Sequence, residues 1–98
     1  MKYGWIIDKD HFFNPEFDSK SAVGVMGHRG IDSIIESELK DGRGGKFRML
    51  DDDGDVVYEG RIMGPDFSGF EPLDDYGTPN FGCTTIEYCD AAGKWYQL

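Results

Sequence analysis

Two β-forming segments joined by an acidic turn are the feature that most limits how this chain can fold. Residues 46–50 and 56–63 flank Asp51-Asp52-Asp53-Gly54-Asp55, and an Asp-Gly pair between such segments is a strong signal for a tight hairpin turn. In the second segment Glu59 and Arg61 alternate with apolar or small residues, so one strand face is expected in the core and the other in solvent. The sequence therefore predicts an antiparallel hairpin in the middle of the chain.

The other expected elements surround this hairpin. The one helical spacing of apolar residues lies in 31–39, where Asp32 or Ser33 is the expected N-cap and Gly42 the stop. Together these elements predict an α+β fold, with a single short helix packed on one face of an antiparallel sheet of about five or six strands. The 98 residues are expected to form one domain, 1–98. The further strands are expected over 2–8, 22–26, 84–89 and 94–98.

Residues 64–82 contain three prolines and four glycines, so no long regular element is expected there. A structureless connection of this length is uncommon in a small domain and is often functional. It is also one of two segments that mix carboxylates with aromatic residues; the other holds Asp10, Phe12, Phe13, Glu16, Phe17 and Asp18. Such a mixture suits organic cations and the side chains of Arg or Lys, although phenylalanines that pin a loop onto the core give the same pattern.

The charge of the chain is distributed unevenly. Nineteen Asp and Glu against ten Lys and Arg give a net charge of −9, and residues 1–49 are neutral with eight of each sign. Residues 50–98 hold only Arg61 and Lys94 against eleven acids. This field repels phosphate, so neither direct nucleic-acid binding nor an anionic membrane surface is expected. The acidity either keeps the domain dispersed or attracts a basic partner.

Neither the carboxylates of residues 51–55 nor the two cysteines match a known metal site. An EF-hand loop counted from Asp51 needs glycine and glutamate where this chain has Val56 and Ile62. Solvated turn carboxylates are expected instead, although four carboxylates in five residues leave a looser divalent site open. Cys83 and Cys89 would lie about 20 Å apart on a continuous strand, too far for a disulfide. We therefore expect no metal, two free thiols and a cytoplasmic location, since no membrane or signal segment is evident.

Catalytic motifs are absent from the sequence, so we expect a protein that is not an enzyme and has no cofactor. No nucleophile elbow, Walker loop or dinucleotide fingerprint is present. His11 beside Asp10, or a cysteine with a lowered pKa, is the remaining route to catalysis. Gly27-His28-Arg29-Gly30 precedes the expected helix and fits either an anion site at its N-terminus or, as we favour, a plain turn.

Two binding functions follow from these features. The first is a small acidic protein that docks on a basic protein partner, in its strongest form an inhibitor that mimics nucleic acid, of the kind that phage and mobile elements carry. The second is a small-molecule module whose aromatic and acidic pocket holds cationic or amphipathic ligands between Trp5, Trp95 and the aromatic loops. A free edge strand could also pair with a second copy to form a homodimer. The expected acidic surface is Asp51, Asp52, Asp53, Asp55, Asp66, Glu71, Asp74 and Asp75, and the expected aromatic residues are Phe67, Phe70, Tyr76, Trp5 and Trp95.

Overall fold

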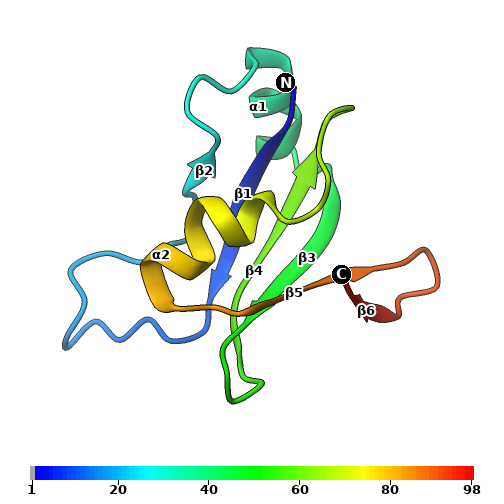
Figure 1. Ribbon diagram of the computed structural model, residues 1–98. Coiled ribbons are helices and arrows are strands. Elements are labelled where there is room, and N and C mark those ends of the chain that lie inside the picture. The colour runs from blue at the N-terminus through cyan, green and yellow to red at the C-terminus, as the bar shows by residue number, and fades with distance from the viewer. Residues whose placement is uncertain (1) are drawn as a thin grey trace.

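The computed structural model describes residues 2–98, which form an antiparallel sheet with helical segments on both of its faces (Figure 1). The expected α+β class, the sheet and its short helix are confirmed. The spatial order of the strands is β2-β1-β4-β3-β5-β6, so the predicted hairpin, β3–β4, occupies the centre. The strands are β1 (Gly4–Asp10), β2 (Met26–Gly27), β3 (Gly45–Leu50), β4 (Val56–Met63), β5 (Thr85–Cys89) and β6 (Trp95–Gln97).

The central hairpin closes as the sequence predicts. Gly54 adopts φ +81°, a conformation that glycine reaches without steric penalty, and its N–H donates to the Asp51 carbonyl at 3.0 Å. A bulge between Met49 and Leu50 changes the register of the ladder. As a result Val57 and Tyr58 are both buried, although simple alternation would place only one of them in the core.

Helix α1 (Ser33–Lys40) begins and ends where its sequence signals lie. The Asp32 carboxylate accepts hydrogen bonds from the backbone N–H groups of Ile34 and Ile35, and Gly42 follows the helix with φ +93°. Ile35 and Leu39 of this helix pack against Ile6 of β1. We call this side of the sheet the α1 face.

The larger part of the core lies on the opposite side, under the helical segments η1 (Leu73–Gly77) and α2 (Thr78–Phe81). Figure 1 shows these segments crossing one side of the sheet, which we call the η1–α2 face, while α1 lies behind its other side. Each of the large apolar side chains fully buried here contributes roughly 2 kcal/mol through removal from water. The core side chains of this face include Trp5, Ile7, Phe47, Met49, Val57, Ile62, Leu73, Ile86 and Tyr88.

The expectation of an irregular connection throughout 64–82 is wrong, because residues 71–81 are helical. Pro72 lies at the start of the segment, where its missing N–H leaves no hydrogen bond unmade. Pro79 would disturb a uniform α-helix by clashing with the carbonyl four residues earlier. It is preceded by a wider turn, in which the Thr78 N–H donates to the carbonyl of Leu73, five residues before it. Within residues 2–98, no helix is long and apolar enough to cross a bilayer.

Candidate functional site: an acidic and aromatic face

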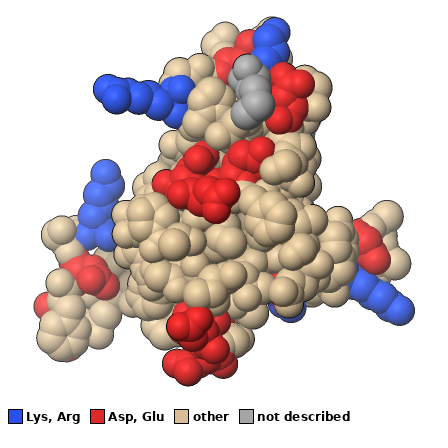
Figure 2. Space-filling view, viewed as in Figure 1, with Lys and Arg blue, Asp and Glu red and all other residues tan. Residues whose placement is uncertain are grey.

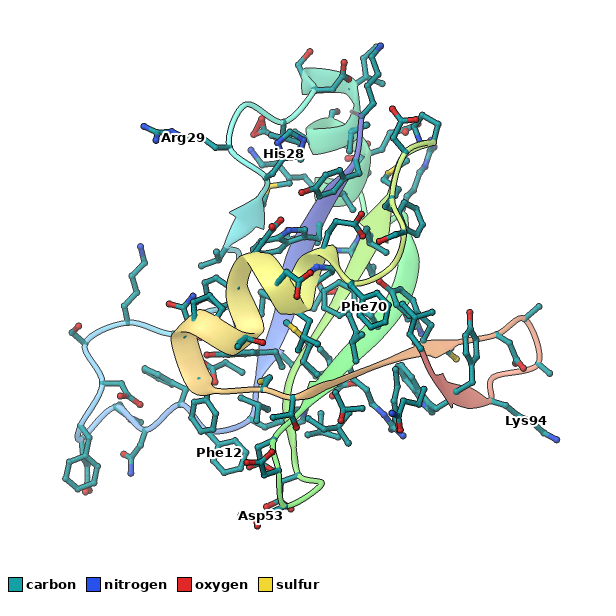
Figure 3. The ribbon with its side chains drawn as sticks, viewed as in Figure 1. Phe12, His28, Arg29, Asp53, Phe70 and Lys94 are labelled. Atoms are coloured by element: carbon teal, nitrogen blue, oxygen red, sulfur yellow. The ribbon has the colours of Figure 1, made fainter. Side chains whose placement is uncertain are left out.

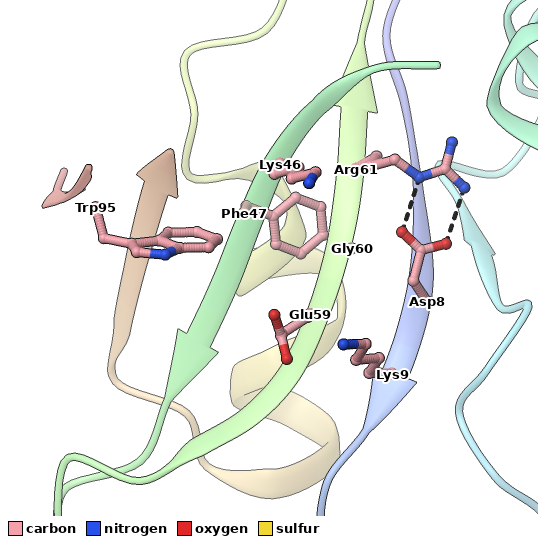
Figure 4. A pocket seen from close by; sticks show the side chains of 8 residues that line it. All are labelled: Asp8, Lys9, Lys46, Phe47, Glu59, Gly60, Arg61 and Trp95. Carbon is pink, nitrogen blue, oxygen red and sulfur yellow. Dashed lines mark hydrogen bonds and ion pairs between the residues drawn. The ribbon is translucent and has the colours of Figure 1, made fainter. Parts of the chain in front are cut away.

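Ion pairs gather on the α1 face and along helix α1. Arg48 pairs with Glu87 across the strands, and His11 Nε2 pairs with Glu59. Arg61 pairs with Asp8, as Figure 4 shows. A shallow hollow of about 130 Å³ beside these pairs is lined by three basic and two acidic side chains, together with Trp95. The charges on this face therefore largely cancel one another.

Arg61 joins three parts of the α1 face. Its Nε and Nη2 donate to the two carboxylate oxygens of Asp8 at 2.7 and 2.8 Å. Its Nη1 donates to the carbonyls of Leu39, in the last turn of α1, and Arg43, each at 2.7 Å. The hydrogen bond with Asp8 raises the pKa of the guanidinium, although burial acts in the opposite direction. The guanidinium thus fixes the C-terminal end of α1 onto β1 and β4.

The carboxylates of the expected acidic surface lack such partners. Within residues 2–98, none of the eight expected residues forms an ion pair with Lys or Arg. Figure 2 shows carboxylates over the middle of the η1–α2 face and at the hairpin tip below it, with surface free of Asp, Glu, Lys and Arg between them and basic side chains mainly along the outline. The expected acidic residues therefore lie in separate groups rather than in one continuous patch.

The hairpin tip carries the first group, Asp51, Asp52, Asp53 and Asp55. Asp51 Oδ1 accepts hydrogen bonds from the backbone N–H groups of Asp53 and Asp55, both at 3.0 Å. Carboxylate oxygens of Asp51, Asp53 and Asp55 lie within 4.8 Å of one another. The bonds within the turn account for Asp51, and nothing further at the tip indicates a bound cation.

Asp75 is held by neutral donors. Its Oδ2 accepts hydrogen bonds from the Tyr3 hydroxyl and from Trp5 Nε1, both at 3.0 Å. Burial and this hydrogen bond raise the pKa of Tyr3 to about 12. Asp74, the preceding residue in η1, is exposed, as is Asp75 itself. Trp5 is only 3% exposed, so it belongs to the core and anchors η1 rather than lining a binding pocket.

Asp66 and Glu71 shape the loop before η1. The Asp66 carboxylate accepts from the backbone N–H of Lys2 at 2.7 Å. Glu71 accepts from the backbone N–H groups of Ser68 and Gly69, both at 2.8 Å. Burial acts to raise the pKa of Glu71, but these hydrogen bonds outweigh it and lower that pKa. Both carboxylates thus have a structural role in addition to their charge.

The expected aromatic residues do not form one pocket. Trp95 lies on the α1 face, where the Arg48 guanidinium sits 4.3 Å from its ring centroid, whereas Trp5 is buried on the η1–α2 face. Phe67 and Phe70 are partly exposed in the loop before η1. Tyr76 is half-buried, with its ring 5.6 Å from that of Trp5. Of the five residues, Trp5 and Tyr76 are the two whose rings the structure pairs.

A different hollow, of about 180 Å³, lies between the loop after β1 and α2. Its aromatic wall is a row of rings in which Phe12 lies 5.1 Å from Phe81, Phe81 lies 6.3 Å from Tyr58, and Tyr58 lies 5.4 Å from Tyr76. Figure 3 shows Phe12 beside the end of α2, above the hairpin tip that carries Asp53. Asp10 and Asp18 also line this hollow. We call this the aromatic–acidic hollow.

Sequence reasoning missed most of this hollow. The mixed loop with Asp10, Phe12 and Asp18 was recognisable from composition, but nothing local connects it with Tyr58 or Phe81. Burial raises the pKa of Tyr58 and Tyr76, and the negative charge of Asp10 raises both further. The hollow is therefore a place where carboxylate charge acts on partly desolvated aromatic side chains.

The residues considered for catalysis are placed apart. The Asp10 carboxylate accepts from the Ala22 N–H at 2.9 Å, while His11 pairs with Glu59 on the α1 face. Cys83 is buried, and that burial, with the charge of Asp51 adding to it, raises its pKa to about 11. Its thiol is thus protonated at neutral pH, the opposite of what a cysteine nucleophile needs. Both cysteines are free, as expected.

Two further expectations concern the helix start and the sheet edge. The first amides of α1 are taken by Asp32, so the favoured interpretation of the preceding Gly27–Gly30 segment as a plain turn fits the capping. β6 is an edge strand of the sheet, and pairing of this edge with a second copy stays a prediction.

Comparison with known proteins adds no assignment: no family model matches the chain, and no similar protein was found among curated proteins or solved structures.

Proposed function

We propose that this protein is a small, non-enzymatic binding module that docks on a basic surface of another protein through its η1–α2 face. The observation that carries the proposal is the segregation of charge between the two faces. The strand carboxylates of the α1 face, Asp8, Glu59 and Glu87, are paired with basic side chains, whereas those of the η1–α2 face and the hairpin tip have no Lys or Arg partner within residues 2–98. Unpaired charge of one sign steers an oppositely charged partner and speeds its association.

A narrower form of the proposal is an inhibitor whose carboxylates stand where nucleic-acid phosphates would lie on a DNA- or RNA-handling enzyme. Competition separates the two forms, since duplex DNA or RNA displaces a mimic from its target and leaves simple docking at a separate site intact. We place the interaction in the cytoplasm, because both thiols are free and disulfides form where conditions are oxidising.

Charge reversal on each face tests the docking. Asp52 and Asp74 are exposed, and neither side chain hydrogen-bonds to another of residues 2–98, so D52K/D74K changes the field of the η1–α2 face with little effect on folding. E36K/D41K makes the same change in charge on α1 and its C-cap, and it also removes the exposed ion pair of Glu36 with Lys40. Partner proteins are first selected as those that bind the wild-type protein at low salt and are released in a salt step. We expect these partners to associate with D52K/D74K at least about tenfold more slowly than with wild type. Association with E36K/D41K should stay close to wild type, and an equal loss in both variants would contradict docking through this face.

The second candidate, a small-molecule module, is supported by the aromatic–acidic hollow. Its volume of about 180 Å³ is below the roughly 300–1,000 Å³ of pockets that hold drug-sized ligands. A group the size of one side chain therefore fits better than a larger ligand. Thermal stabilisation by small amines, without binding of basic proteins, would favour this candidate.

A further inference from the structure

We infer that the aromatic–acidic hollow receives the guanidinium group of a single arginine side chain from the docked partner. This inference rests on the proposed function and names the contact at its centre. The hollow lies between a loop that follows β1 and the helical segments of the η1–α2 face, so it opens on the surface proposed to dock. Its volume, about 180 Å³, suits one side chain.

The carboxylates at the hollow have acceptor capacity left. Asp10 Oδ2 accepts from the Ala22 N–H, and Asp18 Oδ2 accepts from the Asn14 N–H, each at 2.9 Å. These bonds fix both carboxylates and leave the Oδ1 atoms for another donor. A guanidinium carries five N–H donors in a planar fork, which matches separate acceptors around one cavity.

Tyr58 contributes its ring and its hydroxyl to the hollow. The residue is 5% exposed and lines the hollow. The hydroxyls of Tyr3 and Tyr88 donate to Asp75 and to the Gly69 carbonyl, whereas no such bond ties the Tyr58 hydroxyl to another of residues 2–98. No fully buried side-chain N or O atom within residues 2–98 lacks a partner, so this hydroxyl reaches solvent, where it can donate to or accept from an occupant of the hollow.

Arginine fits this site better than lysine. Its planar, weakly hydrated cation stacks on aromatic faces, and the hollow presents a row of rings from Phe12 through Phe81 and Tyr58 to Tyr76. Lys20 also lines the hollow, so its charged groups are two carboxylates and one ammonium, a net charge of −1. The net negative charge attracts an incoming arginine, and the positive charge of Lys20 makes this attraction weaker than two carboxylates alone would give.

Titration of the labelled protein with an acetylated arginine amide, followed by amide NMR shifts, tests the contact. The expected shifts lie in residues 10–22 and 76–82. The isosteric but neutral citrulline amide should bind at least fivefold more weakly, and the lysine amide should fall between. Phe81→Ala, at a residue 44% exposed, should weaken arginine binding about fivefold without unfolding the protein. Lys20→Gln should tighten it two- to threefold. Equal binding of citrulline, or no change in either variant, would overturn the inference.

A nine-residue arginine peptide separates this inference from the proposed function. Weaker binding by both Phe81→Ala and D52K/D74K is the expected result. If only D52K/D74K weakens binding, the surface docks but the hollow does not hold the arginine. If the peptide does not bind at low salt, docking itself is wrong. If the amide binds and the peptide does not, the hollow is a small-molecule site and the protein partner is wrong.

Discussion

Asp8 and Asp75 both lie against the sheet, on opposite faces, and are held by different kinds of donor. Asp8 receives two hydrogen bonds from the Arg61 guanidinium, so its negative charge is neutralised where it lies. Asp75 receives its hydrogen bonds from the Tyr3 hydroxyl and the Trp5 indole, which carry no charge. Neutral donors fix a carboxylate in position without cancelling its field. The η1–α2 face is therefore rigidly built and still negative, whereas the α1 face is internally balanced.

The largest effect is expected from removing the cation of the α1 face. Arg61→Met leaves the Asp8 carboxylate and the carbonyls of Leu39 and Arg43 without their donor, so we expect the free energy of unfolding in urea to fall by about 3 kcal/mol. Lys46→Met on the same face removes a charge that has no ion pair with another of residues 2–98, and its effect should stay within about 0.5 kcal/mol. Similar losses in both variants would mean that Arg61 acts only through its charge.

A smaller effect is expected from the corresponding carboxylate of the η1–α2 face. Asp75→Ala leaves the Trp5 indole N–H and the Tyr3 hydroxyl without an acceptor, and should lower the free energy of unfolding by about 2 kcal/mol. Asp75→Asn keeps an acceptor oxygen and should lose about half as much. Asp74→Ala is the matched control, because the adjacent Asp74 is equally exposed but accepts neither of these two hydrogen bonds. If Asp75→Asn and Asp75→Ala were equally destabilising, the negative charge of Asp75 rather than its hydrogen bonds would hold η1. That result would contradict the contrast drawn between Asp8 and Asp75.

The smallest effect depends on pH. The pKa of Glu71 in the folded state lies below its ordinary value of 4.5, so its contribution is complete above that pH and is lost as pH falls through the folded pKa. Glu71→Gln should therefore destabilise the protein by about 1 kcal/mol at pH 7, after allowance for solvent screening. The stabilities of wild type and variant should converge as the pH falls from 4.5 through the lowered folded pKa of Glu71. If the difference in unfolding free energy stayed constant down to pH 2, the glutamine side chain would be destabilising for steric reasons rather than through loss of charge.

Local chemistry made much of the fold predictable. Asp53-Gly54 marks the turn of β3–β4 because few residues other than glycine accept a φ of +81°. The Asp32 cap and the Gly42 stop of α1 act within a few residues of the helix ends. The helix over 71–81 was missed because the effect of its prolines depends on their place in the helix, one in the first turn and one after a wide turn.

The sequence by itself determined the α+β class, the central hairpin, the ends of α1 and the concentration of acid in residues 50–98. These features depend on turn conformations, capping and composition, which act over short distances along the chain. Only the tertiary structure decided that Trp5 and Trp95 lie on opposite faces and that Asp75 meets side chains 70 and 72 residues away. Strand order and register set such contacts, and the aromatic–acidic hollow likewise exists only because the sheet brings Tyr58 between the loop after β1 and α2.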